Sequence, residues 1–206
     1  MMFFFLYAFH LKNRRRRRIE NWVRALAARL GCRGDFFAVE GRNLFSSMAM
    51  DWHMDARHRH RHFEIFSAHH RGKRCIRIRL NYSALESLGS LYFSIESRRI
   101  WHGISGILDS QMKKFGDRTL DKRLILRCSD TILPHRLRHF EEFRDSIGRA
   151  SLRSVRGWRL AFADGTLDVA LGYVRLDAGL ADDVEAALEL LCNTADILRF
   201  HAMAIF

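Results

Sequence analysis

Two hairpins that can be recognised in the sequence constrain the fold more than any other feature of the chain. The dipeptide Asp164-Gly165 is a strong signal for a two-residue turn, and alternating apolar and polar residues flank it. A turn at this point places apolar residues opposite one another on one face: Phe162 with Leu167, Leu160 with Val169, and Trp158 with Leu171. A hairpin with one apolar face needs a second layer to cover that face.

The second hairpin follows from a turn at Arg71-Gly72. Its register again sorts apolar residues onto one face, pairing Phe63 with Leu80, Ile65 with Ile78, and Ser67 with Ile76. On the other face Glu64 lies opposite Arg79, which is a favourable cross-strand pair of opposite charge. A shift of one residue would move the apolar side chains to the polar face, so the sequence specifies this register strongly.

Further periodic segments extend the sheet. We expect another hairpin within residues 36–47, strands near residues 91–95 and 123–128, and a short helix or irregular connection over residues 101–115. Together with the two hairpins, these segments predict an antiparallel sheet of about five to seven strands.

Helical spacing supplies the second layer. Helices are predicted over residues 19–30, from Asp130 with Pro134 in the first turn, and from Asp182 onward. The buried face of the last helix is expected to consist of Val184, Leu188, Leu191, Ala195 and Leu198. With 48% hydrophobic residues and no Gly/Ser-rich linker, residues 19–206 predict one α+β domain whose sheet is covered on one face by helices.

The chain begins with apolar residues at positions 1–9 and soon reaches an arginine cluster: Arg14, Arg15, Arg16, Arg17 and Arg18. In a secretory signal peptide the positive charge precedes the apolar stretch, whereas here it follows. Arginine beside an apolar segment favours the cytoplasmic side of a membrane. Residues 1–18 therefore predict a short apolar membrane anchor. The residues expected to contact lipid are Phe3, Phe4, Phe5 and Leu6, together with the arginine cluster at anionic headgroups.

This apolar stretch is short for an anchor. Residues 1–11 would rise only about 16 Å as a helix, whereas a membrane span needs about 20 residues. The segment could be an interfacial anchor or a buried element of the fold. We favour a third interpretation, in which Met1 and Met2 are interior residues of a longer transmembrane helix that lacks its beginning. Because both hairpins can be assembled without this segment, the sequence favours an anchor over a core element.

The net charge of +12 lies entirely within residues 1–130, and residues 131–206 carry a slight acidic excess. A basic surface attracts phosphate on anionic lipid or on nucleic acid, and beside an anchor lipid is the simpler partner. Aromatic residues among the basic ones are candidate stacking groups for nucleic acid: Trp52, Phe63, Phe66 and Tyr82. No nucleic-acid-binding motif accompanies them, and the hairpin register sends Phe63 to the core.

The four cysteines are single and far apart in the sequence: Cys32, Cys75, Cys128 and Cys192. Without a CxxC pair they predict neither a zinc ribbon nor a thiol redox pair, and we expect them to be small core residues. The sequence also lacks a Gly-rich phosphate loop, an HExxH motif and a dinucleotide-binding fingerprint. These features predict a protein without catalysis and without an organic cofactor.

Three histidines alternate with arginine in one segment: His58, His60 and His62. If the strand of the second hairpin extends backward, these histidines and Glu64 share its polar face, with alternate residues about 7 Å apart. Such a set could hold a divalent transition metal. The interleaved arginines oppose a cation, so we favour a solvated basic segment over a metal site, and pH sensing by clustered imidazoles is a third interpretation.

We therefore predict a membrane-tethered domain that faces the cytoplasm and binds an unidentified protein or small-molecule ligand. The first alternative is a basic nucleic-acid-binding protein. The second is a metal-binding protein or enzyme that uses the histidine segment.

Overall fold

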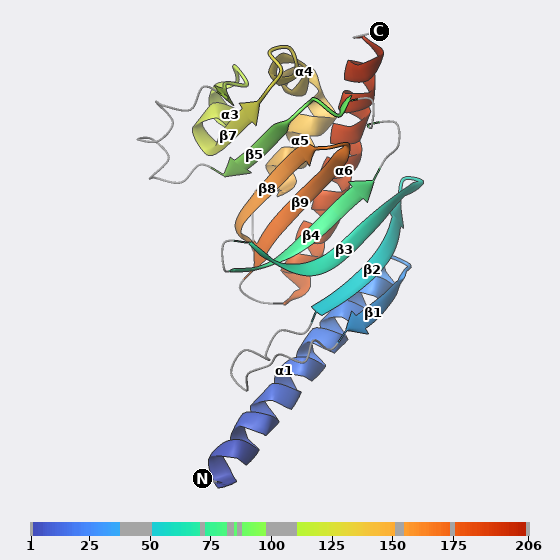
Figure 1. Ribbon diagram of the computed structural model, residues 1–206, viewed down its shortest axis with the longest axis vertical. Helices are drawn as coiled ribbons and strands as arrows, with labels where there is room; N and C mark the ends of the chain where they lie inside the picture. Colours follow the sequence, from blue (N-terminus) through green and yellow to red (C-terminus); the bar gives the residue numbers. More distant parts are fainter. Residues whose placement is uncertain are drawn as a thin grey trace.

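The computed structural model describes residues 2–37, 51–70, 73–81, 85, 88–97, 111–150, 155–173 and 176–204. Within these residues, nine strands form one antiparallel sheet in the order β1-β2-β3-β4-β9-β8-β5-β7-β6 (Figure 1). The strands are β1 (Arg33–Phe37), β2 (Asp51–His58), β3 (Arg61–His70), β4 (Lys73–Asn81), β5 (Phe93–Ser97), β6 (Met112–Lys113), β7 (Leu124–Cys128), β8 (Val155–Ala163) and β9 (Thr166–Tyr173). Helices cover one face, so the predicted α+β fold is confirmed, with more strands than expected.

Both predicted hairpins are present in the predicted registers. Every apolar pair expected between β3 and β4, and between β8 and β9, is formed. Asp164 and Gly165 form the turn between β8 and β9, with positive φ angles of 51° and 72°. β4 also pairs with β9, which joins the two hairpins into one continuous apolar surface. The predicted strands near residues 91–95 and 123–128 correspond to β5 and β7, which pair with each other.

The long helix α6 (Ala178–Met203) lies across the covered face of the sheet (Figure 1). All five residues of its predicted face are buried. The helix begins earlier than expected because Asp177 caps it, accepting a hydrogen bond from the N–H of Leu180 at 2.9 Å. Leu190 and Thr194, on other sides of the helix, are also buried. The buried surface of α6 is therefore wider than the predicted face, while a stripe of the helix that includes Asp182, Glu185 and Asp196 stays partly exposed.

Two helices, α4 (Leu133–His139) and α5 (Glu141–Ala150), occupy the region where the sequence predicted one. The carboxylate of Asp130 accepts hydrogen bonds from the N–H groups of Ile132 and Leu133, and Pro134 lies in the first turn as expected. At Phe140 the backbone is extended, with φ −84° and ψ 110°, and this ends α4. Phe140 packs against the core, and we attribute the end of α4 to this packing, because no glycine or proline occurs at this point of the sequence. A short helix, α3 (Arg118–Arg123), precedes β7.

Helix α1 (Met2–Arg29) is one continuous helix of 28 residues. Its second half is the helix predicted over residues 19–30, and Ile19, Trp22, Val23 and Leu26 in it are buried against the domain. Gly31 follows with a φ of 66°, a conformation that favours glycine and ends the helix where the sequence predicted. The first half of α1 projects away from the sheet (Figure 1).

Several predictions fall outside the described residues. The hairpin expected within residues 36–47 and the connection over residues 101–115 fall largely on residues 38–50 and 98–110. The turn at residues 71–72 and Tyr82 lie outside as well.

The cysteines behave as predicted. Cys75, Cys128 and Cys192 are buried, Cys32 is half-buried, and all four are free thiols. Burial raises the pKa of the Cys128 thiol to about 11. These cysteines are therefore suited to packing and not to thiolate chemistry.

His201, near the end of α6, is a buried titratable group in the core. Its imidazole lies 3.6 Å from the carboxylate of Asp130, and its side chain is 1% exposed. Burial lowers the pKa of His201 below its ordinary value of 6.5; Asp130 opposes this shift and Arg136 adds to it.

We expect His201 to make the protein less stable in mild acid. Because the folded state keeps the ring neutral, the unfolded chain takes up the proton first as the pH falls. The loss begins near pH 6.5 and continues toward the folded pKa, with a slope of at most about 1.4 kcal/mol per pH unit. The free energy of unfolding in urea should therefore fall more between about pH 7.5 and about pH 5.5 in the wild-type than in His201→Phe. Equal pH dependence in the two proteins would contradict this assignment.

Candidate functional site

The arginine cluster surrounds helix α1 instead of marking one side of it. Five consecutive residues, each turned by about 100° from the last, cover the whole circumference of a helix. Arg14, Arg16, Arg17 and Arg18 are exposed. Arg16 forms an ion pair with Glu20 at 2.8 Å, which neutralises part of the charge on one side. The cluster is therefore a basic ring around the projecting half of α1.

The polarity of this half changes along the helix axis. Phe3, Phe4, Phe5 and Leu6 lie in the first two turns, and farther along Tyr7 and Leu11 are 64% and 43% exposed. The basic ring follows, and then the stripe that packs on the domain. A helix that lies flat on a membrane separates polar and apolar residues around its circumference, whereas this one separates them end to end. No helix in the described ranges is both long enough and apolar enough to cross a membrane.

A hollow of about 500 Å³ runs beside the basic ring. The described residues that line it are His10, Asn13, Arg14, Arg17, Arg18 and Asn21. Three of these lining residues are arginines, so the hollow lies beside several positive charges.

Helix α1 is joined firmly to the domain near its buried end. The indole N–H of Trp22 donates a hydrogen bond to the backbone carbonyl of Asp177 at 2.9 Å, and its ring lies 6.0 Å from that of Trp52. Arg29 forms ion pairs with Asp182, at 2.8 Å, and with Glu185. The projecting half of α1 therefore continues a helix that is held against the beginning of α6.

The histidine segment is a hairpin and not the single strand that the sequence predicted. Arg59 and His60 form its turn with positive φ angles of 46° and 63°, and β2 and β3 pair on either side. His58 consequently lies on the covered face of the sheet, whereas His62 and Glu64 lie on the open face. His60 is exposed in the turn. In the part of the chain that the structure describes, no three His, Cys, Asp or Glu side chains gather closely enough to hold a metal ion.

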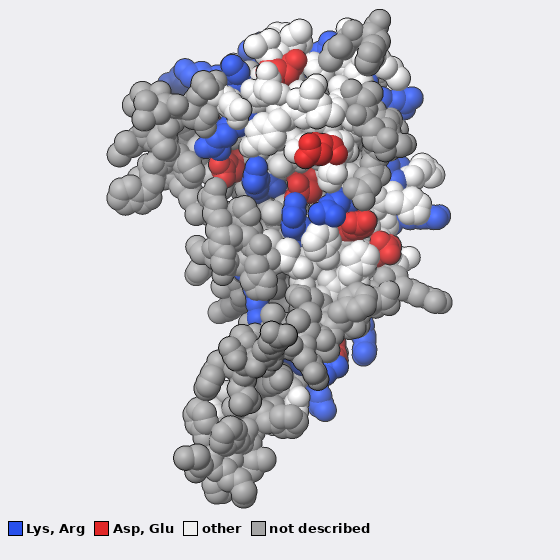
Figure 2. All heavy atoms as spheres, viewed as in Figure 1, with Lys and Arg blue, Asp and Glu red and all other residues white. Residues whose placement is uncertain are grey.

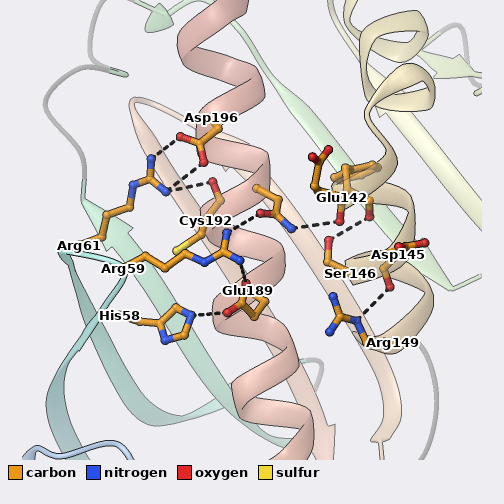
Figure 3. A network of polar contacts seen from close by, with 12 residues as sticks. His58, Arg59, Arg61, Glu142, Asp145, Ser146, Arg149, Glu189, Cys192 and Asp196 are labelled. Carbon is orange, nitrogen blue, oxygen red and sulfur yellow. Dashed lines mark hydrogen bonds and ion pairs between the residues drawn. The ribbon is translucent and has the colours of Figure 1, made fainter.

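Three basic side chains of this hairpin, those of His58, Arg59 and Arg61, contact α6 (Figure 3). Each reaches an acidic residue of the helix: His58 and Arg59 bind Glu189 at 2.7 Å and 2.6 Å, and Arg61 binds Asp196 at 2.5 Å. Burial lowers the pKa of Arg61, but its interactions with the side chains of Asp196 and Cys192 outweigh burial, and the pKa is raised. The hairpin is therefore held against the domain by ion pairs, and it is not a solvated basic arm.

The open face, which is the sheet face opposite α6, carries interspersed acidic and basic side chains (Figure 2). The arginines at its centre have acidic partners: Arg77 with Asp168 at 2.6 Å, Arg127 with Glu96 at 2.5 Å, and Arg79 with Glu64 at 3.5 Å. The hairpin register predicted the last pair. The pairing of Arg77 with Asp168 depends on β4 and β9 being neighbours, so the sequence did not reveal it.

Arg159 on β8 adds a further polar contact to the open face. Its guanidinium donates to the hydroxyl of Tyr92 at 3.4 Å, and that hydroxyl donates to Ser94 at 3.0 Å. A surface of this kind offers directional hydrogen bonds to a polar protein or small-molecule ligand without a strong field of one sign.

The aromatic residues considered for nucleic-acid stacking are mostly unavailable. Trp52 and Phe63 are only 2% and 1% exposed. Phe66 lies under the guanidinium of Arg79, which is 5.3 Å from the centre of its ring. The stacking surface that a single-stranded nucleic acid would need is therefore absent from these three positions.

The positive φ angles in the turn at Arg59 and His60 predict how a glycine substitution there changes the stability of the protein. A left-handed conformation costs a residue with a side chain roughly 1–2 kcal/mol, and glycine is free of that cost. We expect His60→Gly to stabilise the protein by about 1 kcal/mol, which corresponds to a rise in Tm of roughly 2–4 °C.

The matched control is His62→Gly, because this residue lies on β3 and glycine weakens a strand. Thermal unfolding followed by circular dichroism should show opposite shifts in Tm for the two variants. A clear loss of stability in His60→Gly would mean that its side chain makes a contact that outweighs the strain of the turn.

Comparisons of this chain with protein-family models, with curated proteins and with solved structures found no match. Its function is therefore argued from the geometry of its own residues.

Proposed function

We propose that this protein is a membrane-tethered binding domain, in which the projecting half of α1 inserts into a membrane and the sheet domain lies on the cytoplasmic side. The observation that carries the proposal is the order of surfaces along one continuous helix. An apolar end comes first, the basic ring follows, and a buried stripe then packs on the domain. This order matches the order of hydrocarbon, headgroups and water that the helix would meet.

The two parts of the tether would contribute together. Residues 1–11 rise about 16 Å, which is close to the depth of one leaflet of a bilayer whose hydrocarbon core is about 30 Å thick. Burial of a large apolar side chain is worth about 1.5–3 kcal/mol, and a basic residue near anionic lipid adds about 1 kcal/mol. Several of each would make a firm attachment, and the hollow lined by Arg14, Arg17 and Arg18 offers a place for a headgroup phosphate.

A rigid tether would also orient the domain. The contacts of Trp22 and Arg29 with the beginning of α6 hold α1 against the domain. With α1 upright, strands such as β4 run roughly along the membrane normal, and the C-terminus of the chain lies farthest from the lipid (Figure 1). The open face would then remain accessible from the side, and we propose this face as the surface that binds a protein or small-molecule ligand.

Flotation with lipid vesicles tests the tether. We expect the full chain to float with vesicles that contain anionic phospholipid, and to float less with purely zwitterionic vesicles. Replacing the apolar residues Phe5 and Leu6 with glutamate should abolish flotation on both. Changing all five arginines of the cluster to glutamine should weaken binding to anionic vesicles by at least about tenfold.

The matched control removes the same charge from exposed arginines elsewhere: Arg57, Arg118, Arg123, Arg149 and Arg199. This control should float like the wild-type. If the control and the cluster variant lose binding equally, net charge and not the basic ring governs attachment. If the protein does not float but binds single-stranded nucleic acid with an affinity that falls linearly in log salt, the nucleic-acid alternative replaces the tether.

A further inference from the structure

His135 and His139 lie one turn apart on α4 and face each other at the surface. Their Nε2 atoms are 3.1 Å apart, and the centres of their rings are 4.3 Å apart. Both side chains are exposed. Residues four apart are neighbours on one side of a helix, so the backbone of α4 itself places these rings together. Neither histidine belongs to the segment of alternating histidine and arginine.

The separation of the two nitrogens matches the spacing of two ligands on one metal ion. Imidazole nitrogen binds zinc at about 2.0–2.1 Å, which puts two ligands about 3.3–3.4 Å apart at a tetrahedral angle. At the right angle of a square-planar ion the separation is about 2.8–3.0 Å. The observed 3.1 Å lies between these values, so a small rotation of either exposed ring suits both geometries.

The hydrogen bonds around His139 indicate where its lone pair lies. Nη2 of Arg138 is 3.0 Å from Nε2 of His139, and a guanidinium can only donate. Nε2 of His139 therefore accepts, and the proton in the 3.1 Å contact belongs to Nε2 of His135. A metal ion would occupy the place of this proton once His135 changes to the tautomer that carries its proton on Nδ1.

We propose that His135 and His139 form an open, two-imidazole site for a divalent late transition metal: Cu(II), Ni(II) or Zn(II). Imidazole favours these ions over Ca²⁺ and Mg²⁺, and Cu(II) should bind most tightly of the three. Among the residues that the structure describes, no third His, Cys, Asp or Glu joins the pair, so water or an external ligand fills the other positions. This site does not depend on the membrane tether.

Arg138 tunes the affinity of the site. Its charge opposes a cation, and its guanidinium shares the lone pair that the metal needs. Arg138 also donates to the carbonyl of Gly116 at 3.2 Å, so it keeps a partner after releasing His139. Loss of this guanidinium therefore strengthens metal binding, although the same change would weaken a purely structural hydrogen-bond chain.

The test is equilibrium dialysis of the untagged full chain against CuCl₂, NiCl₂ or ZnCl₂ at neutral pH. We expect one equivalent to bind. His135→Ala and His139→Ala should each weaken binding by about tenfold or more, and Arg138→Gln should tighten it. The matched control, in which His58 and His62 are both changed to alanine, should bind like the wild-type.

Uptake that survives in both His135→Ala and His139→Ala, or no uptake at all, overturns the proposal. Loss of uptake only in the variant that lacks His58 and His62 also overturns the proposal, because the metal would then bind to that segment. A second measurement needs no variant. Metal should protect both histidines from diethyl pyrocarbonate, as mapped by mass spectrometry, and unchanged modification rates would contradict the site.

Discussion

The burial of α6 is the constraint on which the rest of the structure depends. The two hairpins, joined by the pairing of β4 with β9, present a continuous apolar surface that must be covered. Helix α6 covers it with a face that includes Val184, Leu188 and Leu191. Burial of each of these side chains stabilises the folded state by about 1.5–3 kcal/mol. Because residues outside this face, such as Leu190 and Thr194, are buried as well, α6 also contacts elements other than the sheet.

These contacts run along the whole length of α6. Trp22 and Arg29 bind near its N-terminus, the hairpin of β2 and β3 binds its middle through Glu189 and Asp196, and Asp130 faces His201 near its end. Helix α1, the hairpin of β2 and β3, and the beginning of α4 are therefore all held against α6, although they are far apart in the sequence.

The two histidine groups illustrate how tertiary context decides chemistry. A metal site was one interpretation of the segment with alternating histidine and arginine, yet its turn sends His58 and His62 to opposite faces, and Glu189 binds both His58 and Arg59. His135 and His139 lie outside the histidine-rich segment of the sequence, yet a single helical turn brings their nitrogens together. Spacing alone distinguishes such cases only when the secondary structure is known, because the same alternation of residues means different geometry in a strand and in a turn.

Local pattern determined a good deal of this protein. The registers of both hairpins, the buried face of α6, the stripe of α1 up to Gly31 and the axial order of apolar and basic residues all follow from periodicity and turn chemistry. Only the tertiary structure decided the turn at Arg59 and His60, which α6 holds in a strained conformation, and the break at Phe140, which core packing imposes. The partnership of Arg77 with Asp168 likewise required β4 and β9 to be neighbours. The physical reason is that a local pattern encodes which face is apolar, whereas strand order, strained turns and ion pairs depend on residues distant in the sequence.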